Sequence, residues 1–88
     1  MAFLSKLFGN KKDQPEPVLH NGFRIFPEPM KEPGGFRISA RIEKEIDSET
    51  KTHLMIRADT VQGFDEAIAA SLAKAKAFID QAGERIFD

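Results

Sequence analysis

The sequence of 88 residues contains no cysteine and only two histidines. Without thiols the chain has no disulfide, no cysteine nucleophile and no zinc–thiolate site, which is compatible with a reducing cytoplasm. His20 and His53 lie far apart in the sequence, and neither has a second histidine at helical spacing. A metal site therefore lacks ligands, and we expect neither a metal nor a cofactor.

Long apolar runs and an excess of charge of one sign are also missing. A membrane-spanning helix needs about 20 predominantly apolar residues, and no run in this sequence approaches that length. The net charge of -1, with 31% charged residues, gives no overall attraction to nucleic acid or anionic lipid. Any such binding must come from a local patch. The length and the hydrophobic content of 41% predict one domain with a modest core, for which oligomerisation is one source of extra stability.

The chain begins MAFLSKLFGNKK, in which four apolar side chains share one helical face: Phe3, Leu4, Leu7 and Phe8. Polar residues interrupt this stretch and no small-residue cleavage site follows it, so it is a poor signal peptide. The next residues, KKDQPEP, contain two prolines and no apolar side chain, as flexible tethers do. We therefore expect residues 1–17 to form an amphipathic segment with a tether, and residues 18–88 to form the domain.

Three docking sites stay open for this N-terminal segment: its own domain, a membrane surface or another chain. A helix of one or two turns is marginal alone in water, so we expect order only where its apolar face is buried. Stable membrane attachment usually needs a longer apolar face or a second signal. We therefore favour docking on protein, either on its own domain or on a second copy in a homo-oligomer.

Period-two alternation predicts three strands in the domain. In GFRIFPEP, Phe23 and Ile25 share one face, Arg24 and Phe26 share the other, and prolines end the strand. After a glycine turn, FRISARIEKEI predicts a second, longer strand, and THLMIRAD predicts a third. The positions expected to face inward on these two strands are Phe36, Ile38, Ala40, Ile42, Ile46, Leu54, Ile56 and Ala58.

The parity of these positions constrains the hairpin between the second and third strands. Directly paired residues of an antiparallel hairpin share a face, so paired residue numbers must have an even sum, and a two-residue loop is excluded. A three-residue loop at Asp47, Ser48 and Glu49 sets Met55 opposite Arg41. This register avoids the repulsion between two arginines that a slip of two residues would produce.

From Phe64 the apolar period becomes helical. The recurring apolar positions are Ile68, Leu72, Ala75, Ile79 and Ala82. Acidic residues at the helix start and Gly83 at its end suit the two termini. A three-stranded sheet needs one face covered. The predicted fold class is α+β: a three-stranded antiparallel β-meander with one C-terminal amphipathic helix packed on one face, plus the short N-terminal amphipathic segment.

No residue pattern points to catalysis. Gly34 and Gly35 precede a strand and not a helix, so they do not form a phosphate loop. The serines lack a nucleophile elbow and a histidine placed to activate them. Acidic residues around Asp47 alternate with lysines and lack the spacing of a calcium loop, which indicates a solvated hairpin tip. We expect neither an enzyme nor a small-molecule substrate.

The face of the predicted sheet opposite the helix is rich in arginine. The candidate contact residues on this face are Arg24, Phe26, Arg37, Arg41, Met55 and Arg57. Guanidinium groups on neighbouring strands can bind phosphates or guanine edges, and an aromatic ring offers a stacking surface. The simpler interpretation, favoured by the usual exposure of arginine, pairs these arginines with Glu43, Glu45 and helix carboxylates. Outward apolar side chains among the arginines are, however, typical of an interface.

Six segments resemble the HlyU family of small bacterial proteins and together cover nearly the whole chain: MAFLSKLFG, GFRIFPEP, GGFRISARIEKE, KTHLMIRADT, DEAIAASLAKAKAFID and GERIF. The family is called transcriptional activator HlyU, so the resemblance implies DNA binding or control of a promoter, with no cofactor or catalytic residue. A helix-turn-helix needs at least two helices, so any DNA contact here must use another element. The strand order is similar to that of DNA-binding domains that place a three-stranded sheet in the major groove.

Two classes of function stay open. The first is a regulator that contacts double-stranded DNA through the arginine-rich sheet face. The second is an adaptor that binds a protein or a membrane surface through the FLSKLF segment. Double-stranded RNA ranks below DNA, because Asp65 and Glu66 at the helix start would repel its phosphates. The near-zero net charge favours the adaptor, and the family resemblance favours the regulator.

Overall fold

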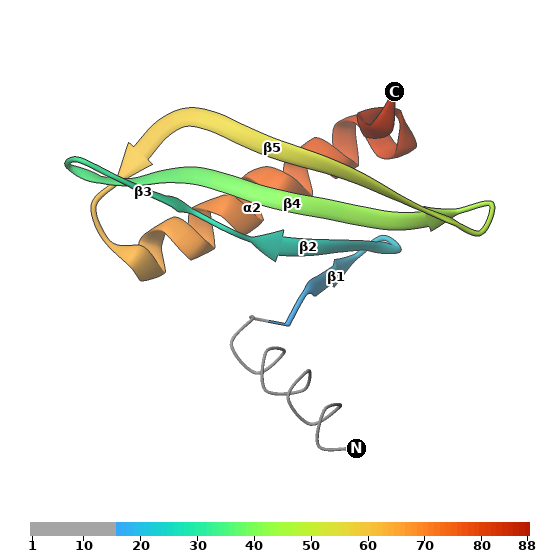
Figure 1. Ribbon diagram of the computed structural model, residues 1–88, viewed down its shortest axis with the longest axis horizontal. Helices are drawn as coiled ribbons and strands as arrows, with labels where there is room; N and C mark the ends of the chain where they lie inside the picture. The colour runs from blue at the N-terminus through green and yellow to red at the C-terminus, as the bar shows by residue number, and fades with distance from the viewer. Residues whose placement is uncertain (1–15) are drawn as a thin grey trace, which may run out of the picture.

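The computed structural model describes residues 16–88, which form a five-stranded antiparallel sheet with a helix across one face (Figure 1). The strands are β1 (Val18–His20), β2 (Phe23–Pro27), β3 (Met30–Glu32), β4 (Gly35–Ile46) and β5 (Glu49–Val61), followed by helix α2 (Phe64–Ala82) and the 3-10 turn η1 (Gly83–Phe87). The predicted α+β class with a C-terminal helix is confirmed. The N-terminal residues predicted to dock on protein, Phe3, Leu4, Leu7 and Phe8, lie outside the described residues.

Strand β4 is the centre of the sheet. β5 pairs along one side of it, β2 and β3 share the other side, and β1 pairs with β2. The segment at Glu28 and Pro29 separates β2 from β3, since proline cannot donate to a strand ladder. The predicted meander is therefore present as β2, β4 and β5, to which β1 adds a further strand beside β2 and β3 adds a short strand beside β4.

The hairpin between β1 and β2 turns on Asn21 and Gly22, which both have left-handed backbone conformations (φ 50° and 84°). Asn-Gly is a favoured dipeptide for such a two-residue turn, because both positions need positive φ. The sequence therefore contained a signal for β1, which the prediction of a first strand at Phe23 did not use.

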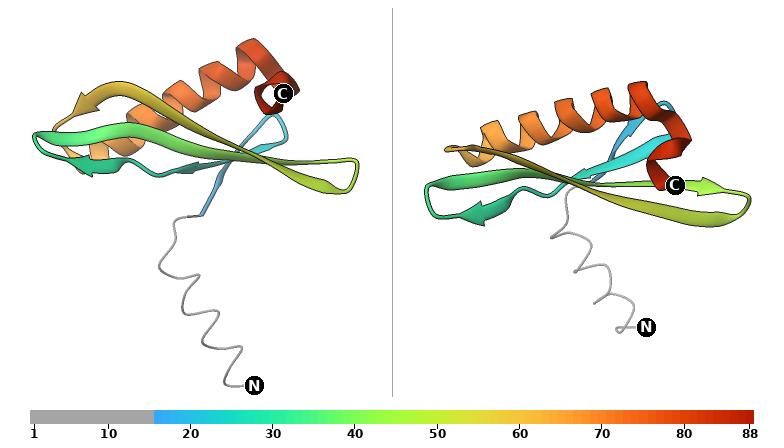
Figure 2. Two further views of the ribbon diagram at one scale, coloured as in Figure 1. Left: turned by 45° about the horizontal axis from the view of Figure 1, so that its top comes forward. Right: turned by 90° about the horizontal axis from the view of Figure 1, so that it is seen from above.

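Helix α2 begins at the predicted residue and lies against one face of the sheet, as Figure 2 shows from two further sides. Asp65 and Glu66 in its first turn complement the positive end of the helix dipole. At its other end, Gly83 has φ 59° and its amide donates to the carbonyl of Ile79, as predicted for a glycine that terminates a helix.

The buried face of α2 consists largely of small side chains, at Ala67, Ser71 and Ala75, which are each 0% exposed. The distance between packed elements depends on the side chains at their contact, so these residues allow the helix to approach the sheet closely. The close approach permits a polar contact inside the core. The Ser39 amide on β4 donates to Ser71 Oγ at 3.2 Å, and Ser39 is itself only 1% exposed.

The break between β2 and β3 explains why Ser39 needs this partner. Its carbonyl accepts a hydrogen bond from the Glu28 amide at 2.9 Å. In a regular antiparallel ladder the Ser39 amide would also donate to the Glu28 carbonyl. The chain leaves the strand at this point, and the hydroxyl of Ser71 supplies the acceptor instead.

The hydrophobic core lies between the sheet and α2. Its buried members are Phe23, Ile25, Ile38, Ala40, Ile42, Met55, Ala75, Ile79 and Ile86. The inward positions predicted on β2 and those from Ile38 to Ile42 on β4 are thereby confirmed. Phe36 is partly buried and packs edge-on against Phe64, with ring centroids 5.5 Å apart. Phe23 stacks on Phe87 of η1, so the C-terminal turn closes the core.

The predicted register of β5 is wrong. Ile46 pairs with Glu49, so the loop contains only Asp47 and Ser48, which have φ values of 54° and 67°. Met55 consequently pairs with Ala40, and the numbers of paired residues have an odd sum. The side chains of β5 that point toward α2 are therefore those that were predicted to point away from it.

Burial follows the observed register. Met55 is only 3% exposed, whereas Leu54 and Ile56 are 53% and 48% exposed, and Ala58, also predicted inward, is exposed. The physical reason is that Leu54, Met55 and Ile56 are consecutive apolar residues, so alternation alone allows two solutions. The length of the turn decides between these two solutions. Its residues, Asp47 and Ser48, adopt a left-handed conformation that is more often formed by glycine or asparagine, so the sequence signals this two-residue turn only weakly.

Candidate contact surface

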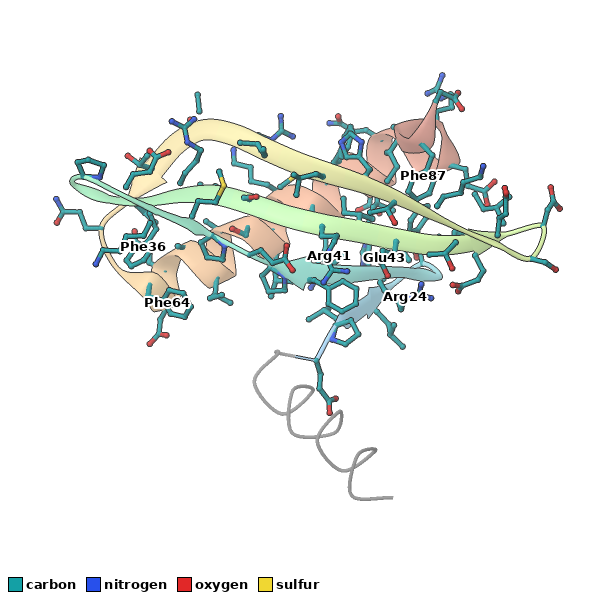
Figure 3. All side chains as sticks on the ribbon, viewed as in Figure 1. Arg24, Phe36, Arg41, Glu43, Phe64 and Phe87 are labelled. Atoms are coloured by element: carbon teal, nitrogen blue, oxygen red, sulfur yellow. The ribbon has the colours of Figure 1, made fainter. Side chains whose placement is uncertain are left out.

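The side of the sheet opposite α2 is called the outer face below. It carries Leu19, Arg24, Phe26, Glu28, Met30, Glu32, Arg37, Arg41, Glu43, Glu45, Thr50, Thr52, Leu54 and Ile56. Figure 3 looks onto this face, with Arg24, Arg41 and Glu43 on β2 and β4 and with the helix behind the sheet. Alternation along each strand places these side chains together, because successive residues point to opposite faces.

Cross-strand pairing builds a network of ion pairs on the outer face. Arg24 lies directly opposite Glu43, and its guanidinium donates to Glu43 at 3.4 Å and to Glu45 at 2.9 Å. Arg41 donates to Glu28 at 3.0 Å and to Glu43 at 2.6 Å. Glu43, whose side chain is 18% exposed, therefore bridges the two arginines.

Two further contacts fix arginines on this face. The guanidinium carbon of Arg41 lies 4.0 Å from the ring centroid of Phe26, its direct partner in the ladder, which is within the range of a cation–π contact. Arg37 pairs with Glu32 and also donates to the main-chain carbonyl of Arg57 at 3.3 Å. These arginines are held in defined orientations.

The ion pairs shift the pKa values of Glu45 and of the three arginines on this face. Hydrogen bonds from Arg24, and then from the Thr50 hydroxyl, lower the pKa of Glu45 to about 2. In return Glu45 raises the pKa of Arg24, and Glu32 raises the pKa of Arg37. Glu28 likewise raises the pKa of Arg41. Glu45 and the three arginines therefore stay ionised at neutral pH.

The outer face is not basic, although it is rich in arginine. Its three arginines, Arg24, Arg37 and Arg41, are matched by four carboxylates on the same face, Glu28, Glu32, Glu43 and Glu45. The formal sum is three positive and four negative charges, or -1. Such a surface does not attract polyanions by its net charge.

Exposed apolar side chains flank the ion-pair network. Leu19 is 72% exposed, Leu54 53%, Ile56 48% and Met30 38%. Half-buried Phe26 lies beside them. Arginine, methionine and aromatic residues are enriched at protein interfaces and glutamate is depleted there, so the arginines, Met30 and Phe26 of the outer face fit a contact surface and its four glutamates do not.

Four of the six predicted contact residues, Arg24, Phe26, Arg37 and Arg41, lie together on the outer face. Met55 does not, because the two-residue turn places it in the core, and its predicted exposure is wrong. Arg57 lies on the helix side of β5, with its guanidinium carbon 5.8 Å from the ring centroid of Phe78 of α2. It is therefore not part of the arginine group, against the prediction.

The sequence reasoning missed Leu54 and Ile56 as surface residues, and Glu28 and Glu32 as partners of the arginines. An odd-sum register would have identified the two aliphatic residues. The two glutamates belong to the proline-rich stretch between the first and second predicted strands, so no predicted strand placed their side chains on a face.

The described part of the chain shows neither of two other kinds of site. None of its helices has the length and apolar character that crossing a membrane requires. Within residues 16–88, no three histidine, aspartate or glutamate side chains gather closely enough to hold a metal ion.

Comparison with known proteins places the chain in a family. A family model described as transcriptional activator HlyU matches residues 2–87. No curated protein and no solved structure matches the chain. The family is one of transcription regulators and not of enzymes. The match spans nearly the whole sequence, and the chain therefore belongs to the HlyU transcriptional activator family.

Proposed function

We propose that this protein regulates transcription by binding another protein through its outer face. The observation that carries the proposal is that glutamates hold every arginine of this face, while Leu54 and Ile56 beside them are about half exposed. Preorganised arginines next to exposed aliphatic side chains lose little conformational freedom on binding. Arginine is one of the residue types that contribute most of the binding energy at protein interfaces.

The same ion pairs oppose direct contact with DNA phosphates. The Nε, Nη1 and Nη2 atoms of Arg41 all donate to Glu28 or Glu43, so a phosphate would have to displace a carboxylate. Affinity for DNA comes largely from neutralising phosphates with unpaired cations. A face whose carboxylates outnumber its arginines supplies little of this attraction.

Direct DNA contact through Arg24, Arg37 and Arg41 is the second candidate, and the family description favours it. In this candidate the sheet face enters the major groove, and the Phe26 ring orients Arg41 toward base edges. Both candidate functions require the protein to be in the cytoplasm, since a bacterial regulator of transcription acts at the chromosome. We also propose that Phe3, Leu4, Leu7 and Phe8 provide a further protein-docking element.

A titration of labelled double-stranded DNA at about 0.1 M salt separates the two candidates, because local phosphate contacts should survive there. If the protein functions by contacting another protein, the fluorescence anisotropy of the labelled DNA should show no saturable change. Saturable binding that Arg24→Ala and Arg41→Ala weaken, and that Lys74→Ala on α2 leaves intact, would establish the DNA candidate and exclude ours. Equal weakening in all three variants would show nonspecific attraction, which also contradicts direct readout by the outer face.

Site-specific photo-crosslinking tests the protein contact itself. A crosslinking residue at Leu54 should give a discrete adduct with a protein other than a second copy of this chain, in cells of the organism that encodes it. The control is the same residue at Gln81, which is exposed on α2. Adducts of equal yield at both positions, or DNA as the species joined at Leu54, would contradict the proposal.

A further inference from the structure

Strand β5 is a long strand at the edge of the sheet. Within residues 16–88 it spans Glu49–Val61 and pairs only with β4. On the other side of β4, β1 and β3 each have only three residues. An edge strand has main-chain amides and carbonyls without strand partners, and a long one can pair with another chain.

The direction of these main-chain groups follows from Ser39. In antiparallel pairing, residues alternate between those bonded to the facing strand and those directed away from it. Ser39 is paired with Ile56, yet its amide donates to Ser71 and its carbonyl accepts from Glu28. Ile56 therefore directs its own amide and carbonyl away from β4. By alternation the same holds for Leu54, Thr52 and Thr50.

The side chains at these four positions do not protect the edge. Thr50, Thr52, Leu54 and Ile56 all lie on the outer face, all are exposed, and none is charged. Natural edge strands are usually blocked by charges, prolines, bulges or short length. Here the irregularity lies beyond Ile56, opposite the step from Arg37 to Ser39, so the ladder from Glu49 to Ile56 is regular.

We propose that two copies of this chain pair antiparallel along β5, in a symmetric dimer with one sheet continuous across both copies. The inference uses the backbone edge of β5 and does not depend on the proposed function. The register that uses the whole regular segment sets Thr52 opposite Leu54 of the partner subunit and Thr50 opposite Ile56 of the partner subunit. Outer-face residues then lie beside outer-face residues, and the aliphatic side chains of both copies form one strip.

Charge complementarity supports this register. It sets Glu49 opposite Arg57 of the partner subunit on the helix side of the sheet, and the two-fold axis repeats that contact. A slip that put Leu54 on the axis would set Lys51 opposite Arg57 of the partner subunit, which is repulsive. A further slip would run the ladder into the irregular part of β5 after Ile56.

Sedimentation analysis of the full chain tests the pairing at protein concentrations up to about 1 mM, where even millimolar dissociation constants leave measurable dimer. We expect the wild-type mass to rise with concentration from 9.9 kDa toward twice that value. Thr52→Pro removes an amide that the dimer uses and that the monomer directs to solvent, so it should give a monomer. The matched control Thr52→Ala keeps the amide and should remain dimeric.

A charge exchange tests the register without relying on the proline variant. Glu49→Lys and Arg57→Glu should each weaken the dimer by roughly 3- to 30-fold, because each contact occurs twice, and the double variant should restore association. A wild-type chain that stays monomeric would refute the dimer. A dimer that persists in folded Thr52→Pro would place the interface elsewhere, and two charge variants that fail to rescue each other would refute this register.

Discussion

The hydrogen bond between the Ser39 amide and Ser71 Oγ allows a sharp test of how the helix is fixed on the sheet. Both residues are at most 1% exposed, and the donor–acceptor distance is 3.2 Å. Ser71→Ala removes the acceptor and leaves a buried amide unsatisfied, which costs about 1–3 kcal/mol. Alanine is the better helix former by about 0.5 kcal/mol, so the net loss of unfolding free energy should be about 0.5–2.5 kcal/mol.

Urea unfolding at 25 °C, followed by circular dichroism, measures this loss. The helix-propensity part is obtained from Ala73→Ser, which makes the reverse change at an exposed position of the same helix. In a domain of this size each kcal/mol also lowers Tm by about 4–8 °C. If Ser71→Ala, corrected by the Ala73→Ser value, were as stable as the wild type, the Ser39 amide would have another partner and the reasoning would fail.

Three further predictions concern the core, the acid range and the N-terminal segment. Ile42→Ala, at a position 0% exposed, should lower the unfolding free energy by about 2–5 kcal/mol. Leu54→Ala, at a half-exposed position, should change it by less than about 0.5 kcal/mol. Equal losses in the two variants would contradict the β5 register. The Glu45 pKa is lowered from 4.5 to about 2 in the folded protein, so its ion pair stabilises the fold above the higher value and is lost as the pH falls toward the lower one. Thermal melts across this window should show a smaller fall of Tm in Glu45→Gln, and a parallel fall would mean that the pair adds nothing. Leu7→Asp should abolish any association made by the N-terminal segment; liposome flotation of the wild type that disappears in this variant would instead show membrane attachment.

Much of the fold was predictable because α2 and β4 carry unambiguous periods. Apolar residues at helical spacing between Phe64 and Gly83 gave the helix and its end. Alternation from Ile38 to Ile42 gave the buried face of β4. The short strands β1 and β3 contain only three residues each, and so short a stretch gives no detectable period.

The orientation of β5 was not predictable from its own residues. Three consecutive apolar side chains, Leu54, Met55 and Ile56, fit either face, and tertiary pairing made the choice. The two-residue turn at Asp47 and Ser48 fixed that pairing in a backbone conformation that neither residue type signals strongly. A one-residue error in loop length inverted the whole strand, moved Met55 into the core and separated Arg57 from the other arginines.

The candidate site shows why counting arginines is a poor guide to DNA binding. Along β4, Arg41, Glu43 and Glu45 are spaced by two, so alternation alone places all three side chains on one face. That spacing supports the simpler sequence interpretation, and the ion pairs of Arg24 and Arg41 with these glutamates confirm it in part. The helix carboxylates that it also named are not partners, because the helix lies on the other face and Glu28 and Glu32 take that place. An arginine that forms an ion pair with a carboxylate two residues away on the same strand has part of its charge compensated within the protein. Its guanidinium then contributes planar shape and fixed hydrogen-bond directions more than charge. A protein surface that has its own paired charges can use these properties, whereas a phosphate backbone mainly requires unpaired positive charge.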